Sequence, residues 1–190
     1  MSDTQWPRYE VFKQDNPQKP HEAVGSVHAP DAELALQNGR DVFVRRPSAV
    51  SLWVVKASNI FTMTREELEA TPDFWPKVSK AAGTPTTFHL FTKTSQRRSM
   101  TFVRHAGQIE AVTPELALRD AIENGRFDAD NVWVWWVVAD EFIHRSQADD
   151  IDSLFAPAVD KTYRQQSHYG FVSPRRQKHG REKLDADERR

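Results

Sequence analysis

The chain has 190 residues, enough to bury a substantial hydrophobic core as one domain or as two small ones. Its 26 Lys and Arg nearly balance its 27 Asp and Glu, so a net charge of −1 gives no reason to expect a polyanionic partner. The lack of cysteine excludes disulfides, thiolate metal sites and cysteine nucleophiles. No segment resembles a signal peptide or reaches the roughly 18 apolar residues of a membrane span, so we expect a cytoplasmic protein.

The first third of the chain predicts two strands, a helix and a third strand. Asp31 is a suitable helix N-cap, and the apolar stripe that follows it should continue until a stop at Pro47. Gly25 indicates a bulge or a close approach of another side chain within the second strand. The three strands are expected where short runs are rich in β-branched and aromatic residues, at Arg8–Lys13, Ala23–Ala29 and Leu52–Ala57.

The same order then recurs. Glu33-Leu34-Ala35-Leu36 is repeated as Glu115-Leu116-Ala117-Leu118, 82 residues later, and at this offset Trp53 falls on Trp135. Tyr9–Phe12 matches Phe88–Phe91 at an offset of 79, so the first loop of the second copy is three residues shorter. A preserved register with a length change confined to a loop is typical of duplicated structural units.

The second copy has its own helix and strand signals. Thr113 followed by Pro114 is a common helix start, and Asn124-Gly125 is a stop signal. The most apolar strand is expected at Asn131–Val138. Trp133 and Trp136 should then face opposite sides of that strand, which would let one side serve as an interface.

These elements predict an α+β fold made of two β-β-α-β units that pair as a pseudo-two-fold fused dimer. The sheet should be largely antiparallel, with the helices on one face. The expected domains are a first unit at residues 1–84, a second unit at 85–172 and a charged, flexible tail at 173–190.

No motif predicts catalysis or cofactor binding. The glycines form no phosphate-binding loop, and no G-x-S-x-G elbow is present. Glu141-x-x-His144 has a spacing found in di-iron sites, but it occurs once, at the end of a strand, and its counterparts Asn59 and Thr62 cannot repeat it. We therefore expect no catalytic, cofactor or metal residues, and no bound cofactor. This pattern favours a binding or scaffolding subunit.

The first copy resembles the phenylacetic acid degradation B (PaaB) family. The shared strings are Trp6-Pro7-x-Tyr9-Glu10-Val11-Phe12, Val24–Ala29, Asn38–Asp41 with Arg45-Arg46, and Leu52–Ile60. The family's C-terminal signature occurs at Phe155, Pro157, Ala158, Lys161, Tyr163 and Arg164.

The resemblance implies a non-catalytic subunit of a multicomponent oxygenase that makes the ring 1,2-epoxide of phenylacetyl-CoA during aerobic phenylacetate catabolism. Such a subunit carries no metal or cofactor and links the di-iron oxygenase core to the reductase. Its partners would be the catalytic and structural oxygenase subunits and the reductase, with no nucleic acid or membrane, and the isolated chain could be a monomeric pseudo-dimer. An ordinary family member has about half this length, so the present chain corresponds to a fused pair.

The fusion predicts a single partner-binding face, because Lys56 and Arg40 become Val138 and Ile122 in the second copy. Two alternatives stay open: a small enzyme or binding protein with a cleft at the pseudo-two-fold axis, and a nucleic-acid-binding module that uses the tryptophans and the basic residues of the tail. Exposed aromatic and basic side chains are typical interface anchors, and the residues expected to contact partners are Trp6, Tyr9, His28, Arg40, Arg45, Arg46, Lys56, Tyr163 and Arg164.

Overall fold

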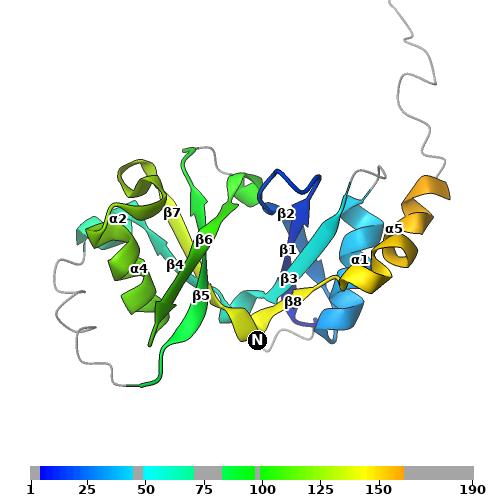
Figure 1. The fold of residues 1–190 in the computed structure, drawn as a ribbon, viewed down its shortest axis with the longest axis horizontal. Coiled ribbons are helices and arrows are strands. Elements are labelled where there is room, and N and C mark those ends of the chain that lie inside the picture. The colour runs from blue at the N-terminus through cyan, green and yellow to red at the C-terminus, as the bar shows by residue number, and fades with distance from the viewer. Residues whose placement is uncertain (1–4, 45–48, 71–82, 97–98, 161–190) are drawn as a thin grey trace, which may run out of the picture. The chain divides into compact units, whose positions relative to one another are not determined.

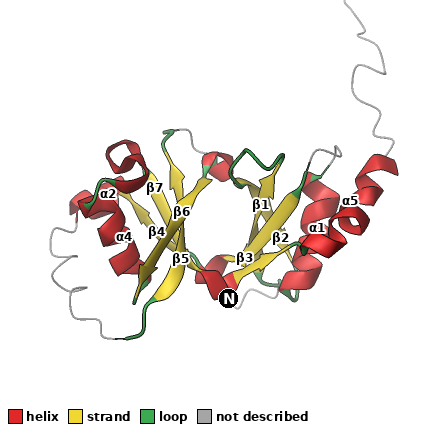
Figure 2. Ribbon diagram, in the orientation of Figure 1, coloured by secondary structure: helices red, strands yellow, loops and turns green. Residues whose placement is uncertain are grey.

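A computed structural model describes residues 5–44, 49–70, 83–96 and 99–160, all within one compact unit, Met1–Asp160. The fold is α+β, with antiparallel strands in one eight-stranded sheet and helices outside it (Figures 1 and 2). The strands are β1 (Arg8–Gln14), β2 (Glu22–His28), β3 (Ser51–Lys56), β4 (Phe61–Thr64), β5 (Thr86–Lys93), β6 (Arg104–Ala111), β7 (Val134–Ala139) and β8 (Ile143–Arg145). The α-helices are α1 (Ala32–Phe43), α2 (Arg65–Ala70), α4 (Pro114–Glu123) and α5 (Ile151–Asp160).

The two copies exchange their last strands. The sheet order is β4-β7-β5-β6-β2-β1-β3-β8, so β4 of the first copy pairs with β7 of the second, and β8 of the second copy pairs with β3 of the first. We call β2-β1-β3-β8 the first half of the sheet and β6-β5-β7-β4 the second half. Each half therefore contains three strands of one copy and one strand of the other, and the predicted fused pseudo-dimer is confirmed.

Both long helices start as the sequence predicts. The Asp31 side chain accepts a hydrogen bond from the Leu34 amide (2.8 Å), and the Thr113 hydroxyl accepts one from the Leu116 amide (3.3 Å). Each cap satisfies an amide that has no partner inside its helix. The first helix ends at Phe43, before the predicted stop, and residues 45–48 lie outside the described part of the chain.

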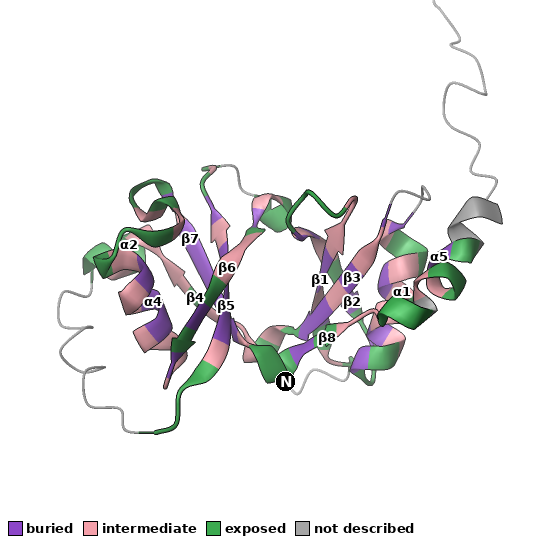
Figure 3. Cartoon of the chain, in the orientation of Figure 1, coloured by how far each residue is buried: buried purple, intermediate pink, exposed green. Residues whose placement is uncertain are grey.

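The buried residues, whose backbone is purple in Figure 3, form three core clusters. The first lies between the first half and its helices, where Leu52 and Val54 of β3 meet α1 and Phe155 of α5. The second is its counterpart around α4, with Trp135 and Val137 of β7. The third contains inward-facing residues of both halves, including Phe12 and Phe91, whose ring centroids lie 4.3 Å apart. These two phenylalanines occupy equivalent positions in the two copies, as expected near a two-fold axis.

The strand β7 corrects the sequence alignment by one residue. Val11 pairs with Val54, whereas its counterpart Leu90 pairs with Val137, so β3 and β7 are related by an offset of 83. Trp53 therefore corresponds to Trp136, and the expected match with Trp135 is wrong. The extra residue therefore lies between α4 and β7, a stretch that contains the 3-10 segment Arg126–Asn131, and β7 begins at Val134, later than the predicted Asn131.

Two glycines make room for aromatic rings at equivalent bulges. The β1–β2 register shifts beside Gly25, and the β5–β6 register shifts beside Gly107. A Cβ atom on Gly25 would come within 2.6 Å of Phe43, and one on Gly107 within 2.5 Å of Phe127. Only Gly25 also has a positive φ, of +143°, which L-residues rarely adopt. The bulge predicted at Gly25 is confirmed.

We expect Gly25→Ala to destabilise the chain more than Gly107→Ala. Both substitutions press a methyl group against an aromatic ring, but only Gly25→Ala also forces a side chain onto a strained backbone, at a cost of about 1–3 kcal/mol. Chemical denaturation of both variants measures the difference in the free energy of unfolding. Equal losses would mean that backbone strain at Gly25 is negligible.

Candidate partner interface

Four of the predicted contact residues meet at one end of the first half. In the strand register Arg8 is opposite His28 and Tyr9 is opposite Lys56, so the start of β1 and the ends of β2 and β3 lie side by side. Trp6 is held just before β1, because its carbonyl oxygen accepts a hydrogen bond from His28 Nδ1 (2.7 Å).

The second copy contributes a further aromatic side chain to this edge. Phe142 precedes β8, and the pairing of Ile143 with Val55 brings it beside Lys56. Phe142 is 40% exposed and Trp6 is 58% exposed, whereas Tyr9 packs into the core at 6%. We call the exposed set the aromatic–basic edge: Trp6, Arg8, His28, Lys56 and Phe142. Tyr9 therefore belongs to the first core cluster and not to this exposed set, and its assignment as a partner contact stays a prediction.

The other predicted contact residues lie elsewhere. Arg40 pairs with Asp41 (3.1 Å) and lines a separate groove of about 520 Å³ between α1, β8 and α5. Trp6, His28 and Lys56 do not line this groove. Arg45, Arg46, Tyr163 and Arg164 lie outside the described residues. Their assignment as contacts stays a prediction.

Sequence reasoning missed a cluster of polar side chains between the two halves. His89 is 1% exposed; its Nε2 lies 2.7 Å from Asp140 Oδ1, and its Nδ1 lies 2.9 Å from His105 Nε2. Because the carboxylate can only accept, His89 Nε2 donates to Asp140, and in neutral His89 the Nδ1 atom then accepts from His105. Arg145 also contacts Asp140.

The first copy contributes Trp53 and His21 to this cluster. The Trp53 ring stacks on His21 with centroids 3.7 Å apart, and Arg145 Cζ lies 5.1 Å from the centre of the same ring. His21 Nε2 lies 3.0 Å from the Ser51 hydroxyl. We call His21, Trp53, His89, His105, Asp140 and Arg145 the histidine cluster. It joins residues of both copies and of both halves of the sheet.

Burial sets the charge of the cluster. Desolvation, with the nearby cations, lowers the pKa of His21 to about 3 and that of His105 to about 4. Desolvation also lowers the pKa of His89, although the hydrogen bond to Asp140 opposes this effect. Burial alone would raise the pKa of Asp140, but the hydrogen bonds from His89 and Arg145 lower it overall. At neutral pH His21 and His105 are therefore neutral beside a charged Arg145–Asp140 pair.

The residues that the second copy contributes to the cluster have no equivalents of the same type in the first copy, which explains why the repeat did not reveal the cluster. By the strand registers, His89 corresponds to Glu10, His105 to Ala23 and Arg145 to Thr62. Its members also come from β3, β5, β6, β8 and two connecting segments, so no local spacing links them. The one available signal was the appearance of histidines in the second copy where the first has other residue types.

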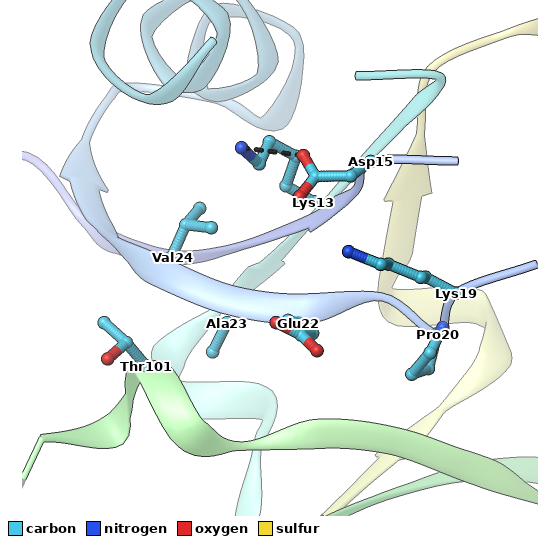
Figure 4. Close-up of a pocket in the computed structure, with 8 residues that line it drawn as sticks. All are labelled: Lys13, Asp15, Lys19, Pro20, Glu22, Ala23, Val24 and Thr101. Atoms are coloured by element: carbon cyan, nitrogen blue, oxygen red, sulfur yellow. Dashed lines mark ion pairs between the residues drawn. The ribbon is translucent and has the colours of Figure 1, made fainter. Parts of the chain in front are cut away.

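The remaining pockets are small or open. One, of about 270 Å³, lies where β2 meets Thr101 and is lined by Lys13, Asp15, Lys19, Glu22 and their neighbours (Figure 4). Lys13 and Asp15 form an ion pair there (2.9 Å). Among the described residues no group of three His, Asp or Glu is placed to hold a metal ion. Glu141 lies in the turn before β8 and His144 in β8 itself, not on a common helix.

Comparison with known proteins agrees with the duplication. The model of the family "Phenylacetic acid degradation B" matches residues 5–95 and again residues 84–176. The chain belongs to this family. A similar protein is a 1,2-phenylacetyl-CoA epoxidase subunit of Escherichia coli (strain K12), which is 48% identical over 67 residues, covering 35% of this chain and 70% of that protein. No solved structure matches.

In the described part of the chain, every helix is too short or too polar to cross a membrane.

Replacing Asp140 with asparagine should lower the pKa of His89. The substitution removes the carboxylate that favours the imidazolium form while leaving burial unchanged, so desolvation acts unopposed. Titration of the His89 ring by NMR in both proteins measures the shift. A raised pKa in Asp140→Asn would show that the carboxylate does not control the charge of this histidine.

Proposed function

We propose that the chain is a non-catalytic bridging subunit of a multicomponent phenylacetyl-CoA ring-epoxidising oxygenase in aerobic phenylacetate catabolism. In this role it links the di-iron oxygenase core to the reductase. The observation that carries the proposal is the double family match on a chain that folds as one pseudo-dimer. One chain would then do the work of a pair of ordinary subunits.

The aromatic–basic edge is the surface that we assign to partner binding. Trp6 and Phe142 are exposed apolar residues at the same end of the first half as Arg8 and Lys56, and aromatic and basic residues are typical interface anchors. The equivalent edge of the second half has Glu110 where the first has His28, and Ala139 where the first has Lys56. We therefore assign the expected single binding face to the first half; the strand registers make Ala139, and not Val138, the counterpart of Lys56.

The alternative of a cleft at the pseudo-two-fold axis has less support. Phe12 and Phe91 contact each other there, and the third core cluster surrounds them. His21, His89 and His105 line neither the groove beside Arg40 nor the pocket beside Thr101. A closed, packed centre suits a scaffold better than a substrate site. The expected cytoplasmic location, the absence of a cofactor and the identity of each partner stay predictions.

Binding to partners tests this assignment directly. The chain is co-expressed with the oxygenase and reductase subunits, and complexes are isolated and their masses determined. We expect Trp6→Ala to weaken association by about 2 kcal/mol, or roughly 30-fold, because a buried interface tryptophan is lost. Lys56→Glu should weaken it through charge reversal on the same edge.

Met100→Ala is the matched control, since Met100 is also an exposed apolar residue, at 41%, but lies outside the aromatic–basic edge. This variant should associate like the parent chain. If the parent chain neither associates nor affects NADPH-coupled epoxidation, the bridging role is wrong. If it associates and both edge variants bind normally, the role stands and the assigned surface is wrong.

A further inference from the structure

The two halves of the sheet meet at a seam with very few hydrogen bonds. Between β2 and β6 the paired residues are Glu22 and Arg104. The Ala23 amide donates to Val103 O and the His105 amide donates to His21 O, both at 2.9 Å. Glu22 and Arg104 also form an ion pair across the seam (3.0 Å). By contrast, the β1–β2 and β5–β6 ladders inside each half are long and continuous.

The two histidines of this seam are also the acid-sensitive members of the histidine cluster. His21 supplies the carbonyl and His105 the amide of one seam hydrogen bond, and both rings pack against Trp53. Main-chain pairing and side-chain packing are therefore coupled at the same two residues. A change that exposes either ring to water therefore also weakens the hydrogen bond between His105 N and His21 O, which joins the two halves.

The titratable groups that face these rings are Arg145, which is cationic, and other histidines, which become cationic when they are protonated. His21 faces His105, His89 and Arg145, and His105 faces His89 and Arg145. Asp140 is the carboxylate of the cluster, and it is already bonded to His89 and Arg145. The β3 neighbours Trp53 and Ser51 carry no charge, and at the outer rim Glu22 is occupied by Arg104. A proton added to His21 or His105 therefore has no free counter-charge in this cluster.

We propose that His21 and His105 make the β2–β6 seam a pH-sensitive latch, which holds the two halves of the sheet together when both rings are neutral and opens locally when they are protonated. Each half has its own helices, ladder and core cluster, whereas Ala23 and Val103 at the seam belong to the third cluster, which both halves share, so the opening that we propose is confined to the seam. The latch is a property of this chain alone and does not depend on which partner the chain binds.

The direction of the pH effect follows from linkage. In the open state both rings are hydrated and titrate near the ordinary value of about 6.5, whereas in the closed state the pKa is about 3 for His21 and about 4 for His105. The closed seam is thus most stable above about pH 6.5. It loses stability as the pH falls from there towards the closed-state values, because the open state takes up more protons.

Hydrogen exchange on the full chain tests the latch. The amides of Ala23 and His105 report the seam, and amides within the β1–β3 and β5–β7 ladders report the halves. After correction for intrinsic exchange, we expect seam protection to fall by up to about 1,000-fold between pH 7.5 and pH 5.0. Protonation of each histidine in the open state raises the population of that state about 30-fold, and the two factors multiply. Protection inside the halves should change far less.

Two variants separate the latch from general acid sensitivity. His21→Gln combined with His105→Gln cannot be protonated and should remove the pH dependence of seam protection. His144→Gln replaces an exposed histidine of β8 and should retain the pH dependence of seam protection.

Unchanged seam protection in the parent chain, or an equal loss throughout both halves, would overturn the proposal. If the double variant fails to fold, NMR titration of the parent decides: a ring of His21 or His105 that titrates near 6.5 while the seam amides stay protected is incompatible with a latch.

Discussion

Reciprocal strand exchange is the constraint on which the rest of this structure depends. The core of the first half is completed by β8 and α5 of the second copy, and Phe155 of α5 lies in the same cluster as Leu52. The second half depends in turn on β4, whose four residues pair along β7. One copy alone would leave the hydrogen-bonding groups at the edge of its third strand unpaired and the apolar face of its sheet partly uncovered. The two copies therefore form one cooperative fold, and the second copy adds Phe142 to an aromatic–basic edge that the first copy otherwise supplies.

Fusion has also allowed the two copies to diverge where they meet. In a symmetric dimer, residues on the axis face their own copies, as Phe12 and Phe91 still do here. At the seam the equivalent positions hold Glu22 and Arg104, which attract each other, whereas two glutamates or two arginines would repel. Such an exposed pair contributes about 1 kcal/mol at most, but it favours pairing between unlike copies. The histidine cluster is a larger case of the same divergence, since its counterpart positions include Ala23 and Thr62.

Much of the fold could be predicted from the sequence, because each element predicted in one copy could be checked against the equivalent segment of the other copy. Helix caps at Asp31 and Thr113 and the bulge at Gly25 depend on local chemistry, and the structure confirms them. The strand exchange could not be predicted, since β4 and β8 are too short to give a periodic signal and their partners are distant in sequence. The one-residue change of offset at Trp53 escaped detection because adjacent tryptophans at 135 and 136 gave two acceptable matches. At the candidate interface, residue type and the strings shared with the family indicated Trp6, His28 and Lys56, whereas Phe142 required the strand register.

The position of α2 shows how little the fusion demands of the chain. Arg65 begins this helix already docked on the second half: its amide donates to Trp133 O (3.0 Å), and its guanidinium lies 4.5 Å from the centre of the Trp133 ring. The described part of the first copy thus ends beside β7 of the second copy, and because both copies belong to one chain, their pairing needs no encounter between separate molecules. Assembly of the two halves becomes independent of protein concentration, and a dilute chain keeps the same pairing as an abundant one. The number of halves in any complex is then set when the chain is synthesised.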